Sequence, residues 1–267
     1  MRNEQTASPR VLWVSAHPEP GSLNGNLRDI GVRALEAGGH EVVESDLYRL
    51  GWDPVVRPEG LATEGERFSV TQDQRRAFLE DSQPADVQRE QQKILAADAF
   101  VLQFPLWWYG MPAILKGWFD RVLVSGFAFG TDPSTGRRLR FEQGPFVGKR
   151  AFVIVTLGDR PAAIGPRGKS GELRELLFGL LHGSLAYTGM AVLPPMAIPS
   201  ADLVGAEDFT HHAQILEQRL CGLFTDAPLP YRPQFQGDYT EAWELAEHIR
   251  PGETGLSVHL MEEGEHA

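Results

Sequence analysis

Cysteine is almost absent from this chain, since Cys221 is the only one among 267 residues. One cysteine cannot form an internal disulfide, and it provides no thiolate cluster for a metal ion. Disulfides persist mainly in oxidising compartments and are rare in the cytosol. The composition therefore favours a reducing compartment, and we expect a cytoplasmic protein without a metal site.

Long hydrophobic runs are missing as well. A membrane-spanning helix needs about 18 or more consecutive apolar residues, and no stretch of the sequence approaches this length. The opening residues, MRNEQTASPR, lack the apolar core of a secretory signal peptide. We therefore expect a soluble intracellular protein with no membrane span.

Positive charge is scarce, because 25 Lys and Arg residues stand against 36 Asp and Glu residues, for a formal net charge of -11. Binding to nucleic-acid phosphates calls for clustered Lys and Arg. The basic cluster at 137–140 is short, and we interpret it as a solvated loop. We expect no nucleic-acid partner.

The common glycine-rich phosphate motifs are also lacking. Neither the GxGxxG fingerprint of dinucleotide-binding folds nor the GxxxxGK(S/T) loop of nucleotide hydrolases occurs. What is present is an ordinary globular composition, with 42% hydrophobic and 23% charged residues. Such a chain can form one domain with a C-terminal extension.

Short apolar runs alternate with segments of helical periodicity along the chain. Asn24 is expected to cap the first helix, and Gly38 and Gly39 are expected to end it. The predicted strands span residues 11–16, 41–44, 99–104, 151–156 and 190–193, and the predicted helices span 24–38, 71–80, 86–97, 111–122, 172–181 and 209–224.

The periodicity also predicts which side chains enter the core. In the fourth predicted helix, Trp118 and Phe119 fall on the apolar face. In the third predicted helix, Val87, Ile94 and Leu95 are expected to face inward. These assignments leave Trp and Tyr residues just before the fourth helix outside any helical pattern.

The alternation predicts an α/β domain over residues 9–225, a doubly wound five-stranded parallel sheet in the order 2-1-3-4-5. A hairpin-like insert over 127–144 is expected to turn at 132–136. Residues 226–267 are expected to form a C-terminal arm and acidic tail, with the arm packed on its own surface or on a partner's.

The predicted strand order also predicts where a ligand would bind. In such sheets ligands bind beyond the carboxyl ends of the strands where the order reverses, here between the first and third strands. The loop 17–24 leaves the first strand and ends at a helix N-terminus, which favours a phosphate. Gly21, Ser22 and Asn24 offer close approach and hydrogen bonds, while His17 either binds the phosphate or caps the loop.

The loop 105–109 leaves the third strand and carries Trp107, Trp108 and Tyr109. A flat aromatic wall that faces a phosphate site suits a flavin nucleotide. The alternative is that these aromatic residues brace the loop or form a dimer interface. A further loop, 156–159, leaves the fourth strand and is placed to reach the same ligand through its backbone.

Several segments resemble the NAD(P)H:quinone oxidoreductase family, the DT-diaphorase-like enzymes. The resemblance runs from about residue 10 to residue 260, and its most specific motifs are AHPEPxSxNG and FPLxWxGxPAxLKGWF. The segments that carry it are 14–25, 45–48, 103–121, 144–146 and 255–258.

The resemblance implies a flavodoxin-like fold and FAD as cofactor, with FMN as the alternative. It implies NAD(P)H as co-substrate and a quinone-like acceptor, reduced by two electrons in a ping-pong hydride transfer through flavin N5. It also implies a homodimer with the site at the subunit interface. Because the flavin carries the chemistry, no catalytic side chain is expected.

The resemblance also implies two sets of site residues. The cofactor-binding residues would be His17, Ser22, Leu23, Asn24, Pro105, Leu106, Trp107, Trp108, Tyr109, Thr156, Leu157 and Gly158. The acceptor pocket would be lined by Trp108, Tyr109, Phe129, Asp159 and Met190.

Other positions depart from the family. Ile164 and Ser170 stand where well-studied members have a Tyr and a His that manage charge on the reduced flavin, so we expect no proton relay through this pair. Asp159 replaces a loop glycine, and Phe129 and Thr131 replace pocket tyrosines. The Asp159 carboxylate is either a solvent-facing turn group or an unfavourable neighbour of an anionic flavin.

Two other functions fit the same resemblance. Relatives with this fold serve as flavoprotein ancillary subunits of potassium-efflux systems, for which the insert and the arm would provide surfaces. A flavodoxin-like electron carrier is the other alternative. A carrier needs an exposed flavin edge rather than a large aromatic pocket, which favours the enzyme.

Overall fold

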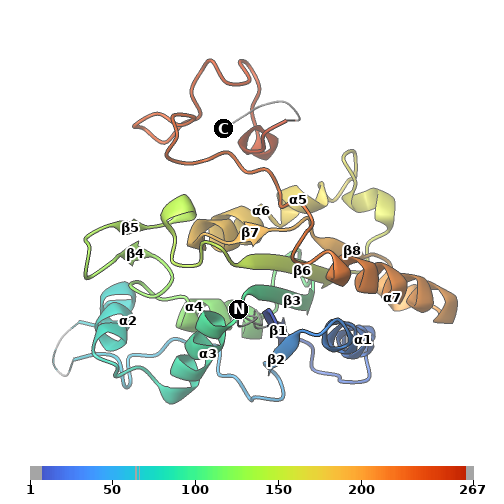
Figure 1. The fold of residues 1–267 in the computed structure, drawn as a ribbon, viewed down its shortest axis with the longest axis horizontal. Helices are drawn as coiled ribbons and strands as arrows, with labels where there is room; N and C mark the ends of the chain where they lie inside the picture. The colour runs from blue at the N-terminus through green and yellow to red at the C-terminus, as the bar shows by residue number, and fades with distance from the viewer. Residues whose placement is uncertain (1–7, 64, 66, 263–267) are drawn as a thin grey trace, which may run out of the picture.

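The computed structural model describes residues 8–63, 65 and 67–262, and it folds around one parallel sheet (Figure 1). The main strands are β1 (Arg10–Ser15), β2 (Glu41–Asp46), β3 (Ala99–Pro105), β6 (Arg150–Thr156), β7 (Ala191–Val192) and β8 (Met196–Ile198). The helices are α1 (Leu23–Ala37), α2 (Val70–Leu79), α3 (Ala85–Ala96), α4 (Ala113–Val122), α5 (Leu173–Leu176), α6 (Phe178–Leu180) and α7 (Ala206–Cys221).

The strand order β2-β1-β3-β6-β7 confirms the predicted order 2-1-3-4-5. The last position is split, however, because β7 pairs with the start of β6 and β8 pairs with its end. Pro194 and Pro195 lie between the two pieces and have no N–H to donate to the ladder. The prediction of a single strand at 190–193 was therefore wrong about its extent and missed β8.

Both faces of the sheet are covered. Along β1, Leu12 and Val14 join the core under α3 and α4, while Val11 and Trp13 join the core under α1 and α7. Figure 1 shows α1 and α7 together on one side, away from α3 and α4. Gly31 lets α1 approach closely, since a Cβ there would lie 2.3 Å from the Trp13 ring. The sequence prediction of a doubly wound sheet is confirmed.

The inner face of α3 differs from the prediction. Leu95 is 60% exposed, so its expected inward position was wrong, whereas Val87 and Ile94 are buried. The positions between them on the inner face include Glu90, whose buried carboxylate accepts a 2.8 Å hydrogen bond from the Trp118 indole. A polar residue occupies the core here because tertiary partners satisfy it.

Two further segments show how the chain departs from long regular elements. The insert forms the predicted hairpin, with β4 (Gly130–Thr131) antiparallel to β5 (Arg138–Leu139). The single helix predicted over 172–181 is instead α5 and α6, followed by a π-helical turn at Leu181–Leu185.

The arm after α7 packs on its own chain. The Leu229 N–H donates to the Val192 carbonyl of β7 at 2.7 Å, and Tyr231 contacts Phe178 of α6 edge-on at 6.4 Å between ring centroids. Figure 1 shows the rest of the arm, in red, at one end of the molecule. Residues 263–267 of the predicted acidic tail lie outside the described residues.

His182 lies at the junction between the arm and the body. Its ring stacks on Phe178 at 4.7 Å and meets the Tyr231 ring at 4.8 Å. Its Nε2 is buried without a hydrogen-bond partner. Burial, and then the neighbouring His259, lower the pKa of His182 to about 4. The imidazole is therefore neutral in the folded protein at neutral pH.

This environment predicts acid sensitivity. Between the ordinary pKa of 6.5 and the folded value of about 4, the unfolded chain binds the His182 proton more tightly, so stability is lost as pH falls through that range. In urea unfolding, we expect wild type to lose about 1 kcal/mol more than His182→Phe between about pH 7 and pH 5, after allowance for partial exposure. The exposed His248→Gln variant is the control, and equal losses in wild type and His182→Phe would contradict the assignment.

Candidate active site

A cavity of about 320 Å³ opens beyond the carboxyl ends of β1, β3 and β6. Its volume is in the range of small-molecule and cofactor sites. The lining residues are His17, Ser22, Leu23, Asn24, Pro105, Leu106, Trp107, Thr156, Leu157, Gly158, Ala201 and Asp202. The sequence predicts all of these except Ala201 and Asp202, so the three loops named from the strand order do meet in one place.

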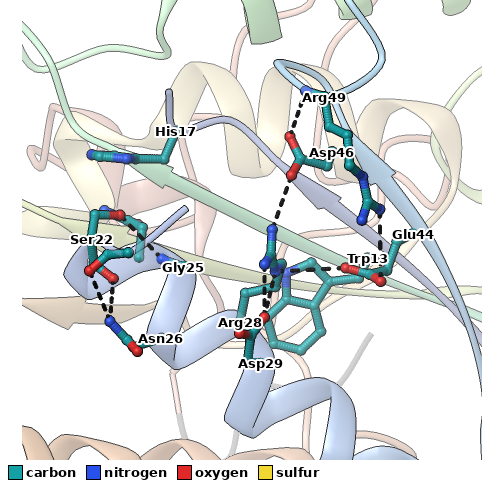
Figure 2. A network of polar contacts seen from close by, with 12 residues as sticks. Trp13, His17, Ser22, Gly25, Asn26, Arg28, Asp29, Glu44, Asp46 and Arg49 are labelled. Atoms are coloured by element: carbon teal, nitrogen blue, oxygen red, sulfur yellow. Dashed lines mark hydrogen bonds and ion pairs between the residues drawn. The ribbon is translucent and has the colours of Figure 1, made fainter. Parts of the chain in front are cut away.

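Ser22, rather than Asn24, caps helix α1. Its Oγ accepts a hydrogen bond from the Gly25 N–H at 3.2 Å, and Figure 2 shows this contact together with the Asn26 amide that closes the loop. The expectation that Asn24 is the cap was therefore wrong. Gly25 allows the tight approach of the loop, because a Cβ there would lie 1.8 Å from the Pro20 carbonyl oxygen.

The Asn24 side chain is used in tertiary contacts instead. Its amide donates to the Thr156 hydroxyl at 2.8 Å, and its backbone carbonyl accepts from the Gln103 side chain at 2.8 Å. Gln103 in turn accepts from the Trp13 indole at 3.0 Å. This buried network joins the start of α1 to β1, β3 and β6, and it fixes the helix end at the cavity.

The helix end has the chemistry of an anion site. The first-turn N–H groups of a helix attract negative charge. Asn24 is 6% exposed, and its Oδ1 has no hydrogen-bond partner. His17 Nδ1 lies 3.1 Å from both the N–H and the carbonyl oxygen of Glu19, so this nitrogen accepts from one or donates to the other according to the tautomer. His17 thus caps its own loop and also lines the cavity, and the helix end fits a ligand with phosphate and hydroxyl groups.

The nearby Arg28 is committed to other partners. Figure 2 shows its guanidinium between Asp46 and Asp29, at 3.0 and 2.7 Å. Burial alone would lower the pKa of Arg28, but the hydrogen bond and charges of these carboxylates raise it. This cation ties α1 to the end of β2, and among the described residues that line the cavity there is no Lys or Arg.

The aromatic corner, residues Trp107, Trp108 and Tyr109, is a tight turn. The Gly110 N–H donates to the Trp107 carbonyl at 3.0 Å, and the two residues between have φ of 51° and 57°. This left-handed backbone is usually taken by Gly or Asn, and each such residue costs about 1–3 kcal/mol. Trp107 lines the cavity, while Trp108 is 100% exposed and Tyr109 is 46% exposed.

Comparison with known proteins agrees with the fold. Residues 9–220 match a family described as having a flavodoxin-like fold. Over 235 residues the chain is 40% identical to a ribosyldihydronicotinamide dehydrogenase-like protein of Penicillium crustosum, covering 86% of this chain and 87% of that protein. Over 261 residues it is 33% identical to NAD(P)H dehydrogenase (quinone) 1 of Rattus norvegicus, covering 93% and 92%.

A solved structure of a proposed quinone reductase from Klebsiella pneumoniae superposes with a TM-score of 0.91 at 42% identity. The alignment covers 95% of this chain and all of that one. The chain belongs to the flavodoxin-like NAD(P)H:quinone oxidoreductase family. Because the alignment with the Klebsiella structure covers 95% of this chain, it includes most of the arm.

The positions that depart from the family pattern lie beside the aromatic corner. The Tyr109 hydroxyl donates to Asp159 Oδ2 at 2.7 Å and lies 3.0 Å from Ser170 Oγ. Hydrogen bonds from Tyr109, and then from Ser170, hold the pKa of the Asp159 carboxyl below its usual range. Asp159 is therefore an ionised, bonded group rather than a free turn residue, and Ile164 is 8% exposed in the core.

Other expected acceptor-pocket residues lie elsewhere in the single chain. Phe129 lines a separate cavity with Tyr187, at 6.5 Å between ring centroids. Met190 is 5% exposed and belongs to the core before β7. One chain therefore brings ten of the twelve predicted cofactor-binding residues around the cavity, but not Trp108 or Tyr109. It does not bring Phe129 or Met190 there either.

Ala201 and Asp202 are the lining residues that sequence reasoning missed. They begin a short helical turn, Ala201–Leu203, directly after β8. The Ala201 N–H donates to the Leu157 carbonyl at 2.9 Å, which holds this turn at the end of β6. Had β8 been recognised as a strand, the rule that ligands lie beyond strand ends would have pointed to them.

Among the residues that the structure describes, no group of His, Cys, Asp and Glu side chains is arranged to hold a metal ion. In the same part of the chain, no helix combines the length and apolarity needed to cross a membrane. The cavity lies where the strand order of the sheet reverses, between β1 and β3.

The close contact at Gly25 gives a prediction about stability. We expect Gly25→Ala to lower the free energy of unfolding by about 1–3 kcal/mol through overpacking, seen as a loss of roughly 3–10 °C in the thermal midpoint. Gly179→Ala is the control, because a Cβ at Gly179 meets nothing within 4 Å. Equal midpoints for the two variants would show that the loop adjusts freely.

Proposed function

We propose that this protein catalyses the two-electron reduction of quinones or related electrophiles by NAD(P)H, with a bound flavin. The observation that carries the proposal is a single cavity that joins an anion-binding helix end to an aromatic corner at the switch point of the sheet. The relatives described above are named as dehydrogenases and a proposed quinone reductase, which favours an enzyme over a potassium-efflux subunit or an electron carrier.

We propose FAD as the cofactor, with FMN as the alternative, because the resemblance reaches into the C-terminal arm. When bound, the flavin supplies hydride transfer through N5. His17, Ser22, Leu23 and Asn24 would hold its phosphates. Pro105 to Tyr109 would hold the ring system, with Thr156, Leu157 and Gly158 along its polar edge.

The protein's own contribution is to bind, orient and exclude water. Asn24 holds the Thr156 hydroxyl, so this group has a fixed direction at the cavity wall. Leu106 and Trp107 supply apolar contact area. Ile164 has no proton to transfer and Ser170 is bonded to Tyr109, so we assign no catalytic side chain and no proton relay to this pair.

We also propose a homodimer in which a second copy covers the aromatic corner. Exposed aromatic clusters usually mark interfaces, and Trp108 is fully exposed in one chain. A second copy would also be the means by which Phe129 contributes to the acceptor pocket, whereas Met190 is buried in the core. We further propose a cytoplasmic protein, supported by the free thiol of Cys221, and a division into a catalytic domain, 9–225, and an arm, 226–267.

Anaerobic reduction tests the proposed activity. We expect the yellow absorbance of the purified holoprotein to bleach on addition of NADPH or NADH, and to return when a benzoquinone is added. Acid release and chromatography of the flavin distinguish FAD from FMN. A protein that retains flavin but is reduced by neither nucleotide would refute the enzyme assignment.

Trp108 provides a second test. We expect Trp108→Ala to weaken flavin affinity about two- to tenfold, the value of one aromatic contact, and to shift the dimer towards monomer in sedimentation. Trp243→Ala is the matched control, since Trp243 is also an exposed Trp, 67% accessible, but lies in the arm. If the flavin affinity and the sedimentation mass of Trp108→Ala equal those of wild type, Trp108 has a purely structural role.

A further inference from the structure

Two segments that are far apart in sequence meet at the polar side of the aromatic corner, the turn after β3 and the connection between β6 and α5. Tyr109 follows β3, Asp159 follows β6, and Ser170 follows the short helical turn Pro161–Ile164. The Tyr109 hydroxyl joins them, at 2.7 Å from Asp159 Oδ2 and 3.0 Å from Ser170 Oγ. Asp159 and Ser170 are both positions at which the chain departs from the family pattern.

The two partners of Tyr109 stand on fixed backbone. The Asp159 carbonyl accepts a hydrogen bond from the Ser200 N–H at 2.7 Å, and the Ser170 N–H donates to the Ala163 carbonyl at 3.0 Å. Tyr109 itself stands on left-handed backbone, with φ of 57° after φ of 51° at Trp108. A strained turn is therefore tied by one hydroxyl to two residues that are held in place.

The contacts of the Tyr109 hydroxyl affect the cavity because the turn is short and includes Trp107. Trp107 lines the cavity, and its carbonyl closes the turn by accepting from Gly110. Strained backbone persists only where its surroundings hold it. If the Tyr109 hydroxyl were released, Trp108 and Tyr109 would relax towards ordinary φ values, and the Trp107 side chain would change direction with them.

We propose that Asp159 is a positioning residue that acts through Tyr109 to hold the aromatic corner in the shape that binds a flat aromatic ring system. The carboxylate accepts a hydrogen bond from the Tyr109 hydroxyl, and Ser170 Oγ lies within hydrogen-bond distance of the same hydroxyl. The ligand class, an isoalloxazine, rests on the proposed function. The positioning of Tyr109 by Asp159 does not depend on a bound ligand.

Ligand affinity of the apoprotein tests the proposal. FAD is titrated into apoprotein, and the dissociation constant is read from quenching of flavin fluorescence. We expect Tyr109→Phe and Asp159→Ala each to weaken binding about fivefold, the value of one hydrogen bond. The double variant should be no weaker than either single variant, because both substitutions remove the same bond.

A conservative variant distinguishes the hydrogen bond accepted by Asp159 from its negative charge. Asp159→Asn keeps an oxygen that accepts from the Tyr109 hydroxyl, so it should bind FAD within about twofold of wild type. The matched control is Asp53→Asn, which removes an exposed carboxylate that accepts a 3.1 Å bond from the Val55 N–H away from the cavity. Urea midpoints of all variants show whether the fold is retained.

A second readout needs no ligand. The near-ultraviolet circular dichroism of the apoprotein reports how tryptophan side chains are held, and we expect Tyr109→Phe and Asp159→Ala to reduce it and Asp159→Asn to preserve it. Wild-type protein that binds neither FAD nor FMN refutes the proposed function, while the dichroism still decides the positioning. The positioning role is wrong if the affinity losses of the two single variants add in the double variant, or if the dichroism spectra are unchanged. It is also wrong if Asp159→Asn binds FAD as weakly as Asp159→Ala.

Discussion

The buried side chain of Gln103 is the contact on which the geometry of the site depends. It is 1% exposed on β3, donates to the Asn24 carbonyl and accepts from the Trp13 indole. Each of these groups, left unpaired in the interior, would cost about 1–3 kcal/mol. The start of α1 therefore has one low-energy position against β3, and this position sets the distance from the helix end to the aromatic corner that follows the same strand.

The two halves of the cavity are stabilised differently. The helix end is held by buried hydrogen bonds of Asn24, Gln103 and Thr156, in backbone without left-handed residues other than glycine. The aromatic corner is exposed and strained, and its tie through Tyr109 is open to water. Exposed contacts open more readily than buried ones. The cavity thus combines a helix end held by buried hydrogen bonds with an aromatic corner held by exposed ones.

The sequence predicted the layers and the loops because burial on two faces leaves a periodic signal, as in β1 and α4. The sequence prediction was wrong at positions where a contact with a residue distant in sequence determines the structure. Leu95 was assigned to the core although Glu90 occupies the inner face with Trp118 as its partner. Asn24 has the residue type of a helix cap, yet Thr156 captures its side chain. β8 was hidden because proline splits its strand position, and the Tyr109–Asp159 contact joins positions with no local pattern.

The two ends of the cavity region differ in their polar groups. Beyond β1, the N–H groups at the start of α1 favour an anion, and His17 lines the cavity beside them. Beyond β6, Asp159 is kept ionised by its hydrogen bonds, and Asp202 lies beside Gly158, 3.6 Å from where a Cβ would be. The strand order places β3 and the aromatic corner between these ends. A ligand with phosphates at one end and flat rings at the other is then favoured in one orientation, since the reverse would bring phosphate against carboxylates. The orientation is thereby favoured by hydrogen-bond donors beyond one strand and carboxylates beyond another, without a Lys or Arg among the lining residues that the structure describes.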